Sequence, residues 1–150
     1  MKERVLVFGA GVIGSVYAVR LAKAGFDVTV SARGERLEAI RAGGLRIRNV
    51  FTAEEETADV RLVERPNSSE RYDLVLVTVR SGQVMDALRT LGSCAGCRAV
   101  AVIGNNLSGH ADQASLVGRE RFVLGFGSFG GYRDEGVIAY LDGRTAEQQG

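Results

Sequence analysis

Hydrophobic positions along the chain recur with two different periods. Short apolar runs rich in β-branched residues predict five strands, at residues 4–8, 27–31, 73–79, 99–103 and 122–127. The run at 73–79 (DLVLVTV) is almost wholly apolar, which is typical of a strand buried on both faces. Between these runs, apolar residues at helical spacing predict four helices, over residues 12–24, 34–42, 82–91 and 109–117.

The segment before the central strand breaks this rhythm. Residues 45–50 (LRIRNV) and 58–63 (ADVRLV) alternate apolar and charged positions, and the polar stretch 52–57 (TAEEET) lies between them. This pattern predicts a hairpin with one solvated face and its three glutamates, 54–56, at the tip. Residues 136–143 (GVIAYLDG) predict one arm of a second hairpin near the end of the chain.

The alternation of strands and helices predicts an α/β fold. Helices that connect successive parallel strands cover both faces of the sheet that the strands form. We therefore expect a doubly wound, Rossmann-type, mostly parallel sheet with a small antiparallel hairpin. A length of 150 residues suits one hydrophobic core, so residues 1–150 are interpreted as a single domain.

Composition narrows the class of protein without indicating a function. Apolar residues make up 45% and charged residues 25% of the chain, as in folded globular domains. A net charge of +1 with scattered basic residues argues against nucleic acid or a membrane as partner. No apolar run approaches the ~20 residues that span a bilayer, and the run near Met1 is too short for a signal peptide. A cytoplasmic location is therefore expected.

Cysteine and histidine receive no functional role. Cys94 and Cys97 have CxxC spacing, but they lie between a helix and a strand rather than at the start of a helix. One such pair also provides too few ligands for a closed zinc site, so we expect no metal. His110 is the only histidine and lies beside a predicted helix start.

The sequence GAGVIG follows the first strand and opens the first helix. Its spacing, G-x-G-x-x-G, is typical of dinucleotide-binding folds in this strand–turn–helix setting. Gly9 would allow a sharp turn, Gly11 would let a diphosphate approach the backbone, and Gly14 would let helix and strand pack closely. The first helical turn also offers unpartnered N–H groups to an anion. We expect the whole loop to bind a dinucleotide: Gly9, Ala10, Gly11, Val12, Ile13 and Gly14.

The second strand ends in a basic sequence, SARGER. NAD-binding folds place an Asp or Glu here, which hydrogen-bonds the ribose 2′-hydroxyl and would repel a 2′-phosphate. Ser31, Arg33 and Arg36 offer donors and positive charge instead. The sequence therefore predicts NADP(H), with Arg33 as the first candidate to hold the 2′-phosphate and Arg36 as the second. The alternative for Arg36 is a solvated helix face.

Two further strand ends are expected to line the cofactor cleft, since ligands of open α/β sheets lie beyond the carboxyl ends of the strands. One strand ends in Thr78 and Val79, followed by Arg80, which could pair with a phosphate or carboxylate. Another is followed by Asn105 and Asn106, whose amides could bond ribose and substrate. Ordinary loop structure and solvation remain the alternative for these polar residues.

Taken in order, these segments resemble the N-terminal domain of the ketopantoate reductase (2-dehydropantoate 2-reductase) family. The resemblance runs from residue 4 to about residue 143 and rests on GAGVIGSVYAVRLAKAG, DLVLVTVRS, IGNNLSG and FVLGFGSFGGYRDEGVIAYLDG. It implies NADPH-dependent reduction of 2-dehydropantoate, a 2-keto acid, to pantoate on the route to pantothenate. It also implies that Arg33 faces the 2′-phosphate, and that Arg80 and Asn105 lie near the nicotinamide and the substrate.

The sequence departs from the family pattern at several places. Arg80 stands where the family has Lys, and Gly104 and Asn106 flank Asn105 where the family has Gln and Gly. The family's second, helical domain supplies a Lys that acts as general acid, and no residue of the 150 matches it. We therefore expect NADP(H) binding with little or no turnover by this chain alone.

Two other functions stay open at this stage. The chain could belong to a reductase of another 2-keto acid, since the asparagine segment is altered. It could also be a non-catalytic NADP(H)-binding module. A homodimer or a separate helical domain would be its expected protein partner.

Overall fold

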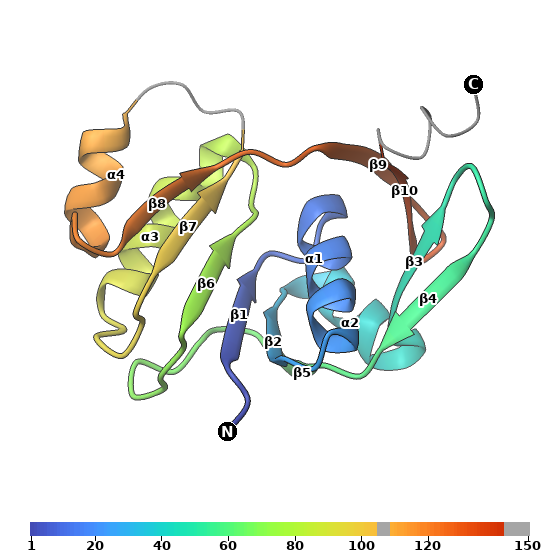
Figure 1. Cartoon of the computed structure of the whole chain (residues 1–150), viewed down its shortest axis with the longest axis horizontal. Coiled ribbons are helices and arrows are strands. Elements are labelled where there is room, and N and C mark those ends of the chain that lie inside the picture. The colour runs from blue at the N-terminus through green and yellow to red at the C-terminus, as the bar shows by residue number, and fades with distance from the viewer. Residues whose placement is uncertain (105–108, 143–150) are drawn as a thin grey trace.

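Helix α1 (Val12–Lys23) lies between two β-sheets in the computed structural model, which describes residues 1–104 and 109–142 (Figure 1). The larger sheet has six parallel strands in the order β5-β2-β1-β6-β7-β8. They are β1 (Arg4–Phe8), β2 (Asp27–Ser31), β5 (Arg61–Val63), β6 (Leu74–Val77), β7 (Val100–Ile103) and β8 (Phe122–Gly125). Counted within this sheet, the order is 3-2-1-4-5-6, so the predicted doubly wound α/β fold is confirmed.

Helices cover both faces of the six-stranded sheet. Besides α1 they are α2 (Gly34–Gly43), α3 (Val84–Gly92), which continues the short 3-10 helix η1 (Ser81–Gln83), and α4 (His110–Val117). Side chains of β1 point alternately to the two faces. Val5 and Val7 join the core formed with α1 and α2, whereas Leu6 joins the core formed with α3 and α4.

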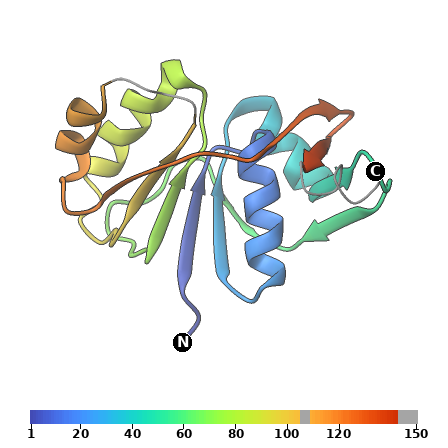
Figure 2. The ribbon, with the colours of Figure 1, turned by 45° about the horizontal axis from the view of Figure 1, so that its top comes forward.

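The second sheet covers the side of α1 that faces away from the first. Its order is β4 (Glu55–Ala58), β3 (Leu45–Asn49), β10 (Val137–Asp142) and β9 (Phe129–Asp134). The central pair β3–β10 is parallel and the two outer pairs are antiparallel. Leu45, Ile47 and Ile138 are buried in the same core as α1. Figure 2 shows the chain passing from β8 over the start of α1 to reach this sheet.

The first predicted hairpin is only partly correct. An antiparallel hairpin does form on β3, but its second arm is β4 (Glu55–Ala58), which lies mostly in the segment expected at the tip, and of the expected arm 58–63 only Ala58 belongs to it. Residues Arg61–Val63 leave the hairpin and pair parallel with β2, whose outer edge would otherwise have no partner. The glutamates are also misplaced by the sequence interpretation, because Glu56 lies within β4 and pairs with Arg20 and Lys23 of α1. The expected late hairpin is confirmed by the antiparallel pair β9–β10.

The two cysteines are buried in the turn after α3. The amide of Cys97 donates to the carbonyl of Cys94 over 3.2 Å, which closes the turn. Burial raises the pKa of the Cys97 thiol to about 11, so the thiolate that redox or metal chemistry requires is disfavoured. Among the described residues, no helix has the length and apolar character needed to cross a bilayer.

Candidate functional site

A groove follows the carboxyl edge of the six-stranded sheet and consists of two adjoining cavities. The first, of about 340 Å³, lies between the loop after β1 and the end of β2, and the second, of about 850 Å³, lies between the start of α1, the end of β7 and strand β9. In the part of the chain that the structure describes, the cavities share five lining residues: Gly11, Thr78, Val79, Arg80 and Arg133. They therefore form one continuous groove across the start of α1, at the place where an open α/β sheet binds ligands.

Gly9 and Gly14 have the structural roles that their spacing predicts. Gly9 has φ +114°, a conformation that favours glycine. A Cβ on Gly14 would lie 1.9 Å from the Gly9 carbonyl oxygen, so only glycine fits where α1 passes the loop. A Cβ on Gly11 would meet no atom of the described residues within 4 Å, which leaves open space above the start of the helix.

The start of α1 is not capped by a side chain. Gly11 is the N-cap residue and makes no side-chain hydrogen bond, and the first turn contains no acidic residue. The N–H groups of a first helical turn have no partners within the helix, and the helix dipole adds partial positive charge there. Val12 and Ile13 of this turn line the second cavity. This helix end can therefore receive an anion from the groove.

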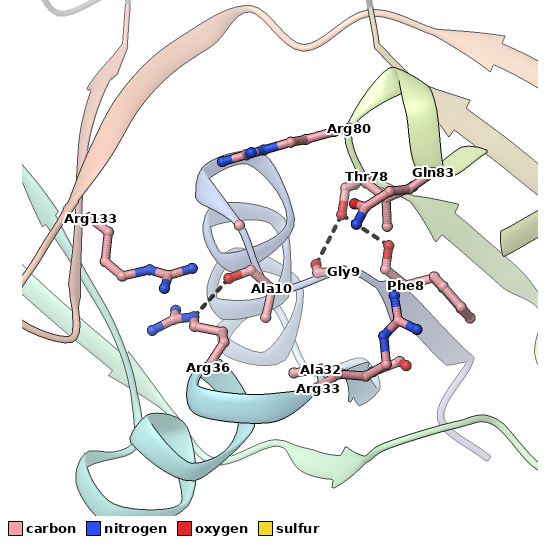
Figure 3. Close-up of a pocket in the computed structure, with 13 residues that line it drawn as sticks. Phe8, Gly9, Ala10, Ala32, Arg33, Arg36, Thr78, Arg80, Gln83 and Arg133 are labelled. Carbon is pink, nitrogen blue, oxygen red and sulfur yellow. Dashed lines mark hydrogen bonds between the residues drawn. The ribbon is translucent and has the colours of Figure 1, made fainter. Parts of the chain in front are cut away.

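Arg36 holds the loop from below instead of pointing into solvent (Figure 3). Its Nε donates to the Ala10 carbonyl over 2.8 Å, and its Nη2 donates to Ser15 Oγ over 3.1 Å. Ser15 in turn donates to Ala10 over 3.2 Å. Burial, with a smaller effect of the nearby Arg133 charge, lowers the pKa of Arg36 to about 10. The solvated-face alternative for Arg36 is wrong, because its side chain fixes the backbone of the glycine loop.

Arg33 remains exposed at the junction of β2 and α2. It is the N-cap residue of α2 and lines the first cavity, and Figure 3 shows its guanidinium beside Phe8. It also lines a neighbouring cavity of about 350 Å³, whose other charged residues are Arg65, Glu64 and Asp86. Ser31 lines the first cavity too, but its hydroxyl donates to the Glu64 carbonyl over 3.1 Å and so ties β2 to the end of β5.

The end of β6 supplies the opposite wall of the groove. Thr78 Oγ1 donates to the Gly9 carbonyl over 3.0 Å, so this side chain positions the loop as well as lining both cavities. Arg80 is exposed and extends over the start of α1 (Figure 3). Asn105 and Asn106 lie outside the described residues, but Ile103 and Gly104 just before them line the second cavity.

Several lining residues are absent from the sequence interpretation, among them Gln83 and Arg133, which have long polar side chains. Gln83, at the end of η1, lines the first cavity, and Arg133, on β9, lines both. The spacing of Gln83, three residues after Arg80, could have placed it on the same wall. Nothing in the local sequence indicates that Arg133 reaches the groove, because its position depends on the path of β9 across α1.

The charge of the groove has one sign. Within the described part of the chain, no Asp, Glu, Lys or His lines either cavity. Four arginines do: Arg33, Arg36, Arg80 and Arg133. Such a concentration stands out in a chain whose net charge is +1. Clefts lined by one sign of charge attract ligands of the opposite sign, so the groove is suited to a polyanion.

Comparison with known proteins agrees with this geometry. The sequence profile of the family "Ketopantoate reductase PanE/ApbA" matches residues 5–148. A 2-dehydropantoate 2-reductase of Mesorhizobium japonicum is 35% identical over 94 residues, which are 62% of this chain and 28% of that protein. The chain thus matches well under half of this curated relative's length.

Solved structures share the fold. The 2-dehydropantoate 2-reductase of Methylococcus capsulatus is 25% identical with a TM-score of 0.75, over 91% of this chain and 45% of that one. A D-mandelate dehydrogenase, solved with NADH and anilino(oxo)acetate, is 21% identical with a TM-score of 0.78. The match covers 91% of this chain and 45% of that one. The profile match covers nearly the whole chain, and the chain therefore belongs to the ketopantoate reductase PanE/ApbA family.

Proposed function

We propose that this chain is an NADP(H)-binding domain of a 2-keto acid reductase. The observation that carries the proposal is an uncapped helix start facing a groove lined by arginines, with no carboxylate among the described lining residues. In this proposal the amide groups of the first turn of α1 hold the diphosphate, and the open space above Gly11 admits it. The adenosine half lies in the first cavity and the nicotinamide half in the second.

The arginine at the end of β2 favours NADP(H) over NAD(H). Arg33 is exposed at the place where NAD-binding folds carry an acid, and it makes no side-chain hydrogen bond or ion pair within the described residues. A guanidinium can bind a 2′-phosphate through two parallel hydrogen bonds. Arg33 is therefore the proposed ligand of the 2′-phosphate.

The proposed reaction is the reduction of a 2-keto acid, with 2-dehydropantoate as the first candidate. When bound, NADPH supplies a hydride for the carbonyl carbon. Arg80 lies on the wall shared by both cavities and can orient the carboxylate of the keto acid. Asn105 is proposed to position the substrate and the nicotinamide.

Protonation of the new alkoxide requires an acid that the described groove lacks. Neither cavity is lined by Lys, His, Asp or Glu within residues 1–104 and 109–142. General acid–base groups typically contribute about 10²–10⁴-fold to rate. We propose that residues 1–150 bind NADP(H) with little turnover, and that a helical domain with a general-acid Lys completes the enzyme, which would serve cytoplasmic pantothenate synthesis.

Fluorescence titration of this chain with NADPH and with NADH tests the cofactor, and loss of NADPH absorbance with 2-dehydropantoate tests turnover. We expect tighter binding of NADPH and negligible turnover. Tighter binding of NADH would overturn the NADP assignment. Rapid reduction of 2-dehydropantoate would instead show that the chain needs no second domain.

A further inference from the structure

Strand β9 passes close to both β10 and the first turn of α1. A Cβ on Gly131 would lie 2.2 Å from the Ala139 carbonyl oxygen and 3.0 Å from Val12 Cγ1. A Cβ on Gly127, just before β9, would lie 2.8 Å from Ile13 Cδ1. Glycine at both positions thus lets the chain approach the same helical turn that faces the groove. Any side chain carried by β9 on this face is brought close to the helix start.

Arg133 is the side chain that uses this approach. It lies two residues after Gly131 and therefore on the same face of the strand. Its partner in the β9–β10 pair is Ile138, which lines the second cavity. Figure 3 shows the Arg133 guanidinium extending toward Arg36 and Ala10, from the side of the groove opposite to Arg80.

Arg133 and Arg36 are neighbouring cations without a carboxylate between them. Within the described residues Arg133 makes no hydrogen bond or ion pair, while Arg36 is bonded only to uncharged oxygens. The adjoining acid, Asp134, instead pairs with Arg48 over 2.6 Å. Burial is the main cause that lowers the pKa of Arg36, and the like charge of Arg133 lowers it further. An anion beside both guanidiniums would provide the missing negative charge.

We infer that Arg133 binds the cofactor diphosphate from β9, in addition to the amide groups of the first turn of α1, and holds it against that turn. This inference rests on the proposed NADP(H) function and adds a residue to it. Arg33 then binds the 2′-phosphate and Arg133 binds the diphosphate, from separate walls of the groove. Arg36 acts through the loop as a positioning residue.

Two fragments of the cofactor separate these roles. ADP-ribose carries the diphosphate without a 2′-phosphate, and adenosine 2′-monophosphate carries the 2′-phosphate without a diphosphate. Calorimetric titration of the chain and of Arg133→Ala with NADPH and both fragments gives the affinities. We expect Arg133→Ala to weaken NADPH and ADP-ribose about tenfold and to change adenosine 2′-monophosphate less than twofold, as for loss of one charged hydrogen-bonding partner.

Control variants keep the test specific. Arg119→Ala removes an equal charge before β8, at the opposite edge of the sheet, and should leave every affinity unchanged. Arg133→Lys should retain part of the ADP-ribose affinity. Thermal midpoints of all variants should match that of the wild type, since Arg133 is exposed.

The outcomes separate the inference from the function on which it rests. Unchanged ADP-ribose affinity in Arg133→Ala, or equal losses for both fragments, would overturn the binding of the diphosphate by Arg133. A loss seen only for 2-keto acid binding to the NADPH complex would also overturn it and assign Arg133 to the substrate. Failure of the wild type to bind NADPH would overturn the proposed function itself.

Discussion

The floor and the rim of the groove are built differently. The floor consists of the glycine loop and the side chains that hold it: Gly9, Ala10, Gly14, Ser15, Arg36 and Thr78. Its polar side chains are hydrogen-bonded to the loop or to one another. The rim consists of Arg33, Arg80 and Arg133, which are exposed and make no side-chain hydrogen bond within the described residues.

The floor therefore determines the shape of the binding site, and the rim provides most of its charge. The floor has its binding geometry before any ligand arrives, which reduces the entropy lost on binding. The rim contributes little to folding, because exposed charges add little stability. Substitutions in the floor should therefore change the free energy of unfolding, whereas substitutions in the rim should change only affinity and specificity.

Gly14→Ala should have the largest effect on stability. Its Cβ would lie 1.9 Å from the Gly9 carbonyl oxygen and 2.5 Å from Thr78 Oγ1, so α1 and the loop must separate. Overpacking of this kind typically lowers the free energy of unfolding by about 1–3 kcal/mol. We expect a loss of about 3 kcal/mol or more here, because the atom that the Cβ meets belongs to the backbone and cannot rotate away. Urea unfolding measures the loss, and a wild-type midpoint would show that the floor is not rigid.

Arg36→Met should come next. It removes the donors that hold Ala10 and Ser15 while keeping a long apolar chain in place. Lost hydrogen bonds to a charged group suggest a cost of about 2 kcal/mol. The matched control is Arg41→Met on the same helix, where the side chain is exposed and, among the described residues, pairs only with the exposed Glu38. Equal unfolding midpoints for the two variants would contradict the structural role of Arg36.

Arg33→Ala should leave stability unchanged and alter only cofactor choice. Loss of the guanidinium should weaken NADPH about tenfold or more and leave NADH within twofold, because only NADPH carries the 2′-phosphate. Parallel fluorescence titrations give both constants. An unchanged ratio of the two would remove Arg33 from the 2′-phosphate site and would break the distinction between floor and rim.

The glycine loop of the floor could be predicted from the sequence because its signals are local: the glycine spacing after a short apolar strand fixes the turn and the helix start. In the rim, the position of Arg33 follows directly from the end of the second strand. The role of Arg36 could not be predicted, because it depends on which face of α2 meets the loop. Arg61–Val63 pairs with β2, and the path of β9 depends on the pairing of β10 with β3. Both are pairings between distant segments, which local sequence patterns do not indicate.

Arg133 shows this limit most clearly. Its position in the groove depends on β10 pairing in parallel with β3, ninety or so residues earlier in the chain, and no local pattern encodes that. Asn105, for which the sequence predicts a place near the nicotinamide, lies outside the described residues, so its role stays a prediction.

The central claim is that a dinucleotide diphosphate lies on the open start of α1, and Gly11→Ala tests it most directly. Within residues 1–104 and 109–142 the added Cβ meets no atom within 4 Å, so the variant should unfold at the wild-type urea concentration. The methyl group would nevertheless occupy the space proposed for the diphosphate. We predict at least a tenfold loss of NADPH affinity by titration, with Gly43→Ala at the end of α2 as an unaffected control. Wild-type affinity in a folded Gly11→Ala variant would contradict the account.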